Sequence, residues 1–253
     1  MWDRKQIKAR GKAAFKANYW ACVIVGLLLT LIVGGSAVGS RRATNSARPN
    51  STTTELTEQL TEIDIAQQEL TQQFNGLTDE EKAVAAAAIF GILAIATIVG
   101  IVLKVFLFNP LQVGCYRFFR MNAQNPKAGV GLIGEGFGSY GHVFVTLLLR
   151  DLLIALWSLL LIIPGIIKSY SYEMVPYIIK DRPDLSSGQV LKLSSQMMQG
   201  NKMQAFIMDL SFIGWFLLGT VTFGLAAVFW ATPYYECSKA ALYLELSNQT
   251  PRY

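Results

Sequence analysis

Long apolar runs separated by short polar segments extend along most of this sequence. The runs at 20–38 and 84–108 reach the ~20 apolar residues that an α-helix needs to cross a hydrocarbon core of roughly 30 Å. Further apolar runs at 142–163, 166–179, 203–218 and 225–246 predict additional crossings. The pattern therefore predicts an all-α fold, a polytopic membrane helical bundle of about six spans arranged partly as hairpins.

The clearest interruption lies in the stretch SLLLIIPGIIKSYSYEM at 158–174, which is apolar until Pro164 and Gly165. Proline removes a backbone donor and glycine permits a reversal, so we predict a tight hairpin with its turn at these two residues. The alternative is a kink in one continuous helix, which would give an odd number of crossings. The kink would also move four basic residues outside, against the positive-inside bias: Lys180, Arg182, Lys192 and Lys202.

The N-terminal segment 1–17 predicts a basic amphipathic surface helix. Its six basic residues alternate with apolar ones, an arrangement that suits a cytoplasmic membrane surface of anionic headgroups: Arg4, Lys5, Lys8, Arg10, Lys12 and Lys16. A solvated start that merely follows the positive-inside bias is the alternative. Both interpretations place the N-terminus in the cytoplasm, and an even number of crossings then places the C-terminus there too.

The remaining residues, 18–253, are predicted to form an integral membrane domain with an extracytoplasmic insertion at 40–83, where acidic residues outnumber basic ones. Capping-box patterns at Thr52 and Glu55, and at Thr78 and Glu81, predict a helix inside the insertion and the start of the second span. Pro110 predicts a bend where that span leaves the membrane. The run at 20–38 is longer than the apolar part of a cleaved signal peptide, so a retained span is favoured.

Composition supports the membrane class. Of 253 residues, 52% are hydrophobic and 15% charged, whereas soluble domains carry about 25% charged residues. The net charge of +5 sets membrane orientation and does not predict a nucleic-acid surface. The three cysteines lie in or beside apolar runs without CxxC spacing, so we expect packing roles and neither a disulfide framework nor a metal site.

Ionisable residues inside predicted spans are the informative ones, because each is costly in lipid unless it is paired or hydrated. The candidates are Arg150, Asp151, Glu173, Asp209 and Glu236. At ~1.5 Å per residue, all five lie roughly 10 to 15 Å from the cytoplasmic ends of their helices. We predict that they meet in one buried polar cluster in which Arg150 is the cation that the carboxylates share. Asp151 points about 100° away from Arg150, so each is expected to find its partner on another span. Lys104 could join this cluster, although extension to the interface is the simpler expectation.

This cluster has two interpretations. It either holds helices together or forms a polar site for an ion, a proton, a peptide or a lipid headgroup, and the sequence favours the first. His142 is the single histidine, and neither HExxH nor GxSxG occurs. The GxGxxG match at 136–141 follows no predicted strand. We therefore predict no enzyme, no catalytic residue and no cofactor.

Five short motifs occur in order along the chain. They are R-x-x-I-K-A-R-G-K followed by NYW at 4–20, IIPGIIKSYSYEM at 162–174, SSQMMQGNK at 194–202, LSFIGW at 210–215 and TPYYE at 232–236. Together they resemble domain of unknown function 975, a bacterial family of multi-pass membrane proteins. The resemblance covers most of the chain except the insertion. That family is also similar to the membrane domain of some glycerophosphodiester phosphodiesterases, which implies a lipid-embedded helper module and not a hydrolase.

The predicted function is that of an uncharacterised bacterial integral membrane protein of the plasma membrane, a non-enzymatic module that supports or regulates a membrane-protein partner. The contacts would come from the N-terminus and from cytoplasmic helices near Lys192, where Val190, Leu191, Leu193 and the Met197–Met198 pair predict one face of a surface helix. The alternative is a small-solute, ion or lipid transporter using the buried charged cluster, with a water-accessible cavity at Arg150. The partners expected are the lipid bilayer and another protein, without nucleic acid.

Overall fold

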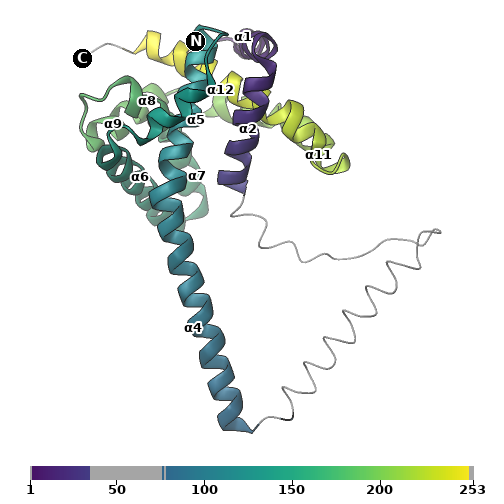
Figure 1. The fold of residues 1–253 in the computed structure, drawn as a ribbon. Helices are drawn as coiled ribbons and strands as arrows, with labels where there is room; N and C mark the ends of the chain where they lie inside the picture. Colours follow the sequence, from purple (N-terminus) through teal and green to yellow (C-terminus); the bar gives the residue numbers. More distant parts are fainter. Residues whose placement is uncertain (1, 35–75, 77, 251–253) are drawn as a thin grey trace, which may run out of the picture. The chain divides into compact units, whose positions relative to one another are not determined.

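The computed structural model describes residues 2–34, 76 and 78–250 of the chain (Figure 1). Within these ranges the regular structure is helical and contains no strand, which confirms the all-α prediction. The chain divides into two compact units, Met1–Gly39 with Leu103–Tyr253, and Ser40–Val102. The predicted helix at Thr52 and Glu55 lies outside the described residues.

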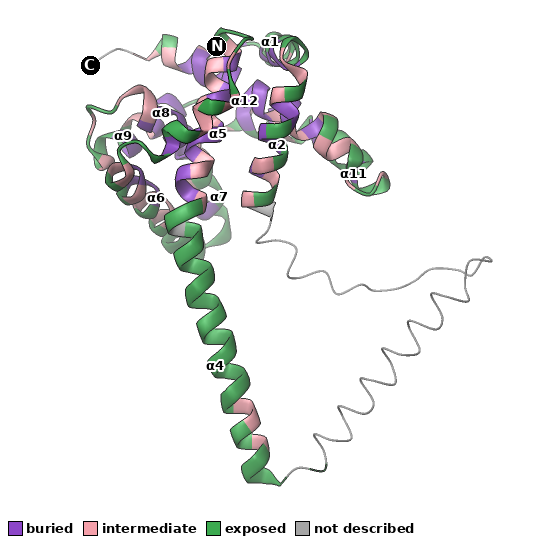
Figure 2. Ribbon diagram, in the orientation of Figure 1, coloured by how far each residue is buried: buried purple, intermediate pink, exposed green. Residues whose placement is uncertain are grey.

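The described part of the second unit is dominated by helix α4 (Asp79–Leu103). The predicted capping box is confirmed at its start, where the Thr78 backbone N–H donates to Glu81 Oε2 at 2.8 Å and the Glu81 N–H donates to Thr78 Oγ1 at 3.4 Å. No residue of α4 is buried, although its sequence is strongly apolar (Figure 2). A helix that exposes apolar side chains on every side is suited to a lipid environment.

The first unit continues from α4 through a π-helical turn, η2 (Lys104–Phe108), into α5 (Asn109–Gln124). Pro110 lies in the first turn of α5, and Phe108 before it has helical dihedrals. The helical backbone therefore continues through the residue at which we predicted the span to leave the membrane. Wider π-type turns are a known way to accommodate the donor that proline lacks.

The N-terminal segment forms α1 (Arg4–Ala17), which is capped by Asp3 through a hydrogen bond from the Lys5 N–H at 3.0 Å. Its apolar face of Ile7, Gly11, Ala14 and Phe15 is buried against α12 (Thr232–Gln249). At Gly11 a Cβ atom would lie 2.6 Å from Ser238 Cα, so the two helices touch through their backbones. The apolar face of α1 is thus occupied by protein.

Helix α2 (Tyr19–Gly34) follows α1 after a single residue, at an angle of 106°. Its inner side packs on α12, where the Sγ atoms of Cys22 and Cys237 lie 3.7 Å apart. Those two cysteines and Cys115 are all buried, and none of the three forms a disulfide.

Two helices, α6 (Tyr140–Leu160) and α7 (Ile162–Ser171), form a close pair. The chain breaks between them at Leu161, which is extended with φ −158° and ψ 139°. Pro164 and Gly165 lie inside the first turn of α7, so the turn precedes the predicted position. Proline is well tolerated in a first helical turn. Gly165 is required by packing, because a Cβ there would lie 2.3 Å from Ser158 Oγ of α6.

Shorter helices complete the unit. They are the 3₁₀ helix η3 (Val130–Phe137), α8 (Val175–Asp181), α9 (Ser187–Met197), α10 (Lys202–Leu210), α11 (Ile213–Val221) and the π-helical η4 (Ala227–Ala231). The predicted surface helix is confirmed as α9, which starts at a capping box of Ser186 and Gln189. After α11 the chain turns through Phe223 and Gly224, both with positive φ.

Three described helical segments are long and apolar enough to cross a membrane: Asp79–Gln124, Tyr140–Leu160 and Lys202–Val221. A fourth results if the bent pair of α1 and α2 forms one span. The predicted count of about six is therefore not confirmed. The predicted fourth crossing is broken into α7 and α8, of 10 and 7 residues. The predicted sixth contains α12, most of which is buried within the protein (Figure 2).

An ionic clamp joins three of these helices on one side of the core. Asp181 at the end of α8 accepts from Arg117 Nη1 at 2.7 Å and from Arg120 Nε at 2.8 Å, both on α5. The Tyr243 hydroxyl of α12 donates to the same carboxylate at 2.8 Å. Tyr243 also stacks on Tyr177 of α8, with ring centroids 5.0 Å apart.

Candidate functional site

The most deeply buried charge in the chain's described part is Lys239 of α12, whose side chain is 4% exposed. Its ammonium group lies 2.6 Å from Asp209 Oδ1 of α10 and forms a second ion pair with Glu173. Glu173 lies in the turn between α7 and α8. One lysine therefore joins three separate parts of the fold.

Aromatic side chains surround this ammonium group. The ring centroids of Tyr235 and Tyr170 lie 5.2 and 5.9 Å from Lys239 Nζ, within the range of cation–π attraction. The Tyr170 hydroxyl also donates to Asp209 Oδ2 at 2.9 Å. Both oxygens of Asp209 are thereby engaged, one by the lysine and one by the tyrosine.

Glu236 lies three residues before Lys239, on the same side of α12, and is 8% exposed. Glu236 and Lys239 are therefore neighbours on α12, and Lys239 is the residue that pairs with Glu173 and Asp209. We call these four residues the Lys239 cluster. It sets three carboxyl groups against one ammonium group.

Arg150 and Asp151 form a different pair. Arg150 Nη2 lies 2.7 Å from Asp151 Oδ1, and its Nε donates to the same oxygen at 2.9 Å. Lys104 Nζ lies 3.8 Å from the other Asp151 oxygen, and its side chain is 63% exposed. The expectation that Arg150 is the cation shared by the carboxylates, with Asp151 paired elsewhere, was therefore wrong. The long guanidinium side chain bends back to the neighbouring carboxylate in spite of the 100° offset.

Lys239 is the functional-site candidate that sequence reasoning missed. The signal was its three-residue spacing from Glu236, which places a lysine and a glutamate on one side of the predicted span at 225–246. A buried acidic residue calls for a nearby cation, and this lysine is nearer in sequence than Arg150.

Three buried oxygens at the cluster have no hydrogen-bond partner among the described residues. They are Glu173 Oε2, Asp209 Oδ1, which is held by its ion pair with Lys239, and the hydroxyl of Tyr177, whose side chain is almost completely buried. Glu173 retains its ion pair through the other oxygen. The Tyr177 hydroxyl thus carries an uncompensated desolvation cost.

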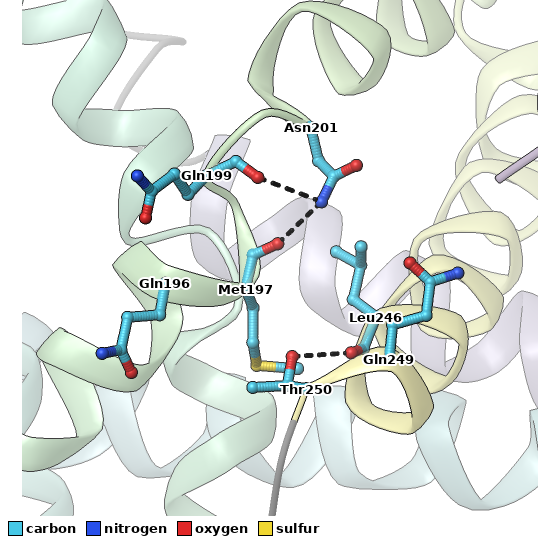
Figure 3. A pocket seen from close by; sticks show the side chains of 7 residues that line it. All are labelled: Gln196, Met197, Gln199, Asn201, Leu246, Gln249 and Thr250. Carbon is cyan, nitrogen blue, oxygen red and sulfur yellow. Dashed lines mark hydrogen bonds between the residues drawn. The ribbon is translucent and has the colours of Figure 1, made fainter. Parts of the chain in front are cut away.

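Two surface grooves open beside α9. The α9 groove has a volume of about 270 Å³ and is lined by Arg182, Leu185, Gln189, Lys192, Leu193 and Gln196. The α12 groove, of about 350 Å³, is drawn in Figure 3 and is lined by Gln196, Met197, Gln199, Asn201, Leu246, Gln249 and Thr250. Because Gln196 belongs to both, the exposed side of α9 is hollowed along its two flanks.

The polar groups of the α12 groove differ in how firmly they are held. Asn201 is fixed, since its Nδ2 donates to the Met197 carbonyl at 3.0 Å and its Oδ1 accepts from Trp2 Nε1 at 3.1 Å. The Thr250 hydroxyl donates to the Leu246 carbonyl at 2.8 Å (Figure 3). The side-chain amides of Gln196 and Gln199 are exposed and can turn toward an incoming group.

The α9 groove is basic. Arg182 bonds Asp184 at its rim, with Nη2 3.1 Å from Oδ2, and this bond holds the pKa of the Asp184 carboxyl below its usual value. Lys192, which also lines this groove, is exposed. The groove therefore combines cationic groups with the side chains of Leu185 and Leu193.

The part of the chain that carries the cluster and both grooves has relatives. Residues 140–250 match a known family. Its description is "Protein of unknown function (DUF975)", and the match runs from the start of α6 to the end of α12. The matched stretch is less than half of the chain, so the N-terminal motif and the insertion lie outside it. No curated protein and no solved structure matches the chain.

Proposed function

We propose that this chain is a non-enzymatic membrane module that supports or regulates a partner protein, and that the partner contacts α9 and its two grooves. The observation that carries the proposal is a contrast in accessibility. The ammonium group of Lys239 is almost completely buried and is paired with Glu173 and Asp209, whereas two grooves on the described surface are open beside α9.

The composition of the groove walls favours binding over catalysis. Neither lining contains a histidine, a cysteine or a carboxylate, the groups that most often act as bases or nucleophiles. Thr250 has the single hydroxyl, and that hydroxyl is bonded to a backbone carbonyl. Amide, aliphatic and cationic side chains remain, which suit a polypeptide ligand.

The partner segment expected here is an acidic peptide in an extended conformation. Lys192 would attract its carboxylates, while Gln196 and Gln199 can exchange hydrogen bonds with peptide groups. Leu185 and Leu193 offer apolar contacts in the lining of the α9 groove. Each groove is near the lower end of the roughly 300–1,000 Å³ range of binding pockets, which suits a few residues of peptide.

The test is purification of the full chain from its native membranes with Lys192→Glu and, separately, Gln196→Arg. The same co-purifying protein should be present with the unaltered chain and should be lost with both variants. Lys127→Glu, an exposed lysine outside the grooves, is the matched control and should retain it. Equal recovery of that protein with all variants would refute the assignment to α9.

We further propose a bacterial plasma-membrane location with both termini on the cytoplasmic side. Support comes from the basic residues of α1 and of the α8–α9 region. Six crossings leave both termini and the α8–α9 region on one side of the membrane, whereas four crossings would place the α8–α9 region on the other side. Reaction of engineered cysteines at Lys5 and Lys192 with an impermeant maleimide tests this, since neither should react in intact cells.

A second candidate function, transport of a proton or small solute, is favoured by the charge imbalance of the Lys239 cluster. Three carboxyl groups against one ammonium group leave room for an added positive charge. Reconstituted vesicles with an internal pH dye would show proton entry by the unaltered chain and its loss in Glu236→Gln. Absence of proton entry in the unaltered chain would exclude proton transport.

A further inference from the structure

Four basic residues of α1 recur at intervals of four, Arg4, Lys8, Lys12 and Lys16, and we call this row the basic ridge. Residues four apart on a helix are neighbours on one side, so the ridge runs along nearly the whole of α1. Arg4, Lys12 and Lys16 are exposed, and none of them pairs with a carboxylate of the described residues. Arg10, on another side of α1, is neutralised by Glu245 at 2.9 Å.

The ridge is unfavourable for α1 taken alone. Each like-charge pair four residues apart destabilises a helix by roughly 0.2–0.5 kcal/mol. Arg4 and Lys5 also lie at the N-terminal end, where the helix dipole opposes positive charge. The burial of Ile7 and Phe15 against α12 holds the helix together in spite of this repulsion. An external anionic surface would remove the repulsion.

The neighbouring helix indicates which anionic surface. The outer side of α2 carries Trp20, Ile24, Leu27 and Leu31, exposed by 68, 53, 40 and 64%, at the spacing of one helical face. Such a row suits acyl chains, and a tryptophan at its start suits the membrane interface. Since α1 departs from α2 at 106°, α1 lies along the headgroup layer when α2 enters the bilayer.

We propose that the basic ridge of α1 binds the headgroups of anionic phospholipids. Because the apolar face of α1 is committed to α12, this contact is electrostatic and does not involve insertion of α1 into the acyl region. Lys8 differs from its neighbours, since its ammonium donates to Ser211 Oγ at 3.0 Å and lies 4.5 Å from the Phe212 ring centroid. Arg4, Lys12 and Lys16 are therefore the lipid-facing members. None of the ridge residues lines either groove, and this proposal does not depend on the proposed function.

The test uses the full chain in a neutral detergent, titrated with short-chain phosphatidylglycerol and followed by its thermal unfolding midpoint. A lysine near an anionic surface contributes a factor of roughly five in affinity, so Lys12→Gln with Lys16→Gln should weaken binding ~25-fold. The affinity of the unaltered chain should fall as salt is added. Lys127→Gln is the matched control and should bind as tightly as the unaltered chain.

Three results would overturn the proposal. One is equal phosphatidylglycerol affinity of the double variant and the unaltered chain. Another is equal binding of phosphatidylglycerol and phosphatidylcholine by the unaltered chain. The third is an equal thermal shift with inorganic phosphate at the same concentration, which would assign the ridge to soluble anions.

Discussion

The ammonium group of Lys239 lies 2.6 Å from Asp209 Oδ1, and this contact joins the last helix of the chain to a candidate membrane span. Asp209 precedes Lys239 by 30 residues in the sequence and lies in the middle of an apolar helical segment. The pair is also linked to Glu173, so one cation stabilises two carboxylates on different elements.

Replacement of Lys239 by methionine should destabilise the protein strongly. Removal of one partner from a buried ion pair costs about 3–5 kcal/mol, because the remaining charges stay buried without compensation. Tryptophan fluorescence during unfolding of the purified chain would measure the loss. Combining Lys239→Met with Glu173→Gln and Asp209→Asn should restore more than half of it. An unchanged single variant would show that the cluster does not stabilise the fold.

Asp181→Asn should weaken the clamp between α5, α8 and α12. The change removes the negative charge that accepts from Arg117, Arg120 and Tyr243. We expect the free energy of unfolding to fall by about 2 kcal/mol. The loss is limited because Arg117 keeps its second ion pair, with Glu135 at 3.1 Å. Chemical unfolding monitors the loss. Asp184→Asn, at an exposed carboxylate, is the control and should change stability little.

Two glycine substitutions should change the stability of the protein in opposite directions. Gly11→Ala places a Cβ atom against the Ser238 backbone and should cost about 1–3 kcal/mol through separation of α1 from α12. Gly188→Ala in α9 meets no atom within 4 Å, so the better helix propensity of alanine should stabilise the protein by up to about 1 kcal/mol. Thermal melts of both variants compare them directly. A stabilised Gly11→Ala would contradict the close contact.

Tyr177→Phe should preserve or raise stability. The Tyr177 hydroxyl is buried without a hydrogen-bond partner among the residues described, while its ring stacks on Tyr243. Removing the hydroxyl keeps the stacking and relieves a desolvation cost of about 1 kcal/mol. Calorimetry of the variant checks the sign. A less stable variant would mean that this hydroxyl holds a bound molecule in the native protein.

Local patterns predicted local structure well. The capping box at Thr78 and Glu81 and the apolar face of α9 involve residues within a few positions of one another, so the sequence alone predicts them. The number of crossings depends instead on what each apolar helix faces. An apolar run looks the same whether it faces lipid or protein, and for this reason α12 was expected to cross the membrane.

The acidic residues of the candidate site were predictable from the sequence, whereas the cation that pairs with them was not. Glu173, Asp209 and Glu236 stand out because acidic residues in apolar runs need compensation, and in the fold the first two pair with Lys239, three residues after Glu236. The cation was assigned to Arg150 on depth alone. Side-chain reach decided the pairing, since Arg150 is satisfied by Asp151 beside it and Lys239 is left for the other carboxylates.

The burial of α1 against α12 constrains the order in which the chain can be assembled. Ile7 and Phe15 of α1 are covered by residues around Ser238 of α12, which are synthesised more than 220 residues later. Apolar segments between these ends can enter the membrane while the ribosome is still translating. Docking of α1 must wait until α12 has been made, so this part of the native core closes only after the intervening helices have been synthesised.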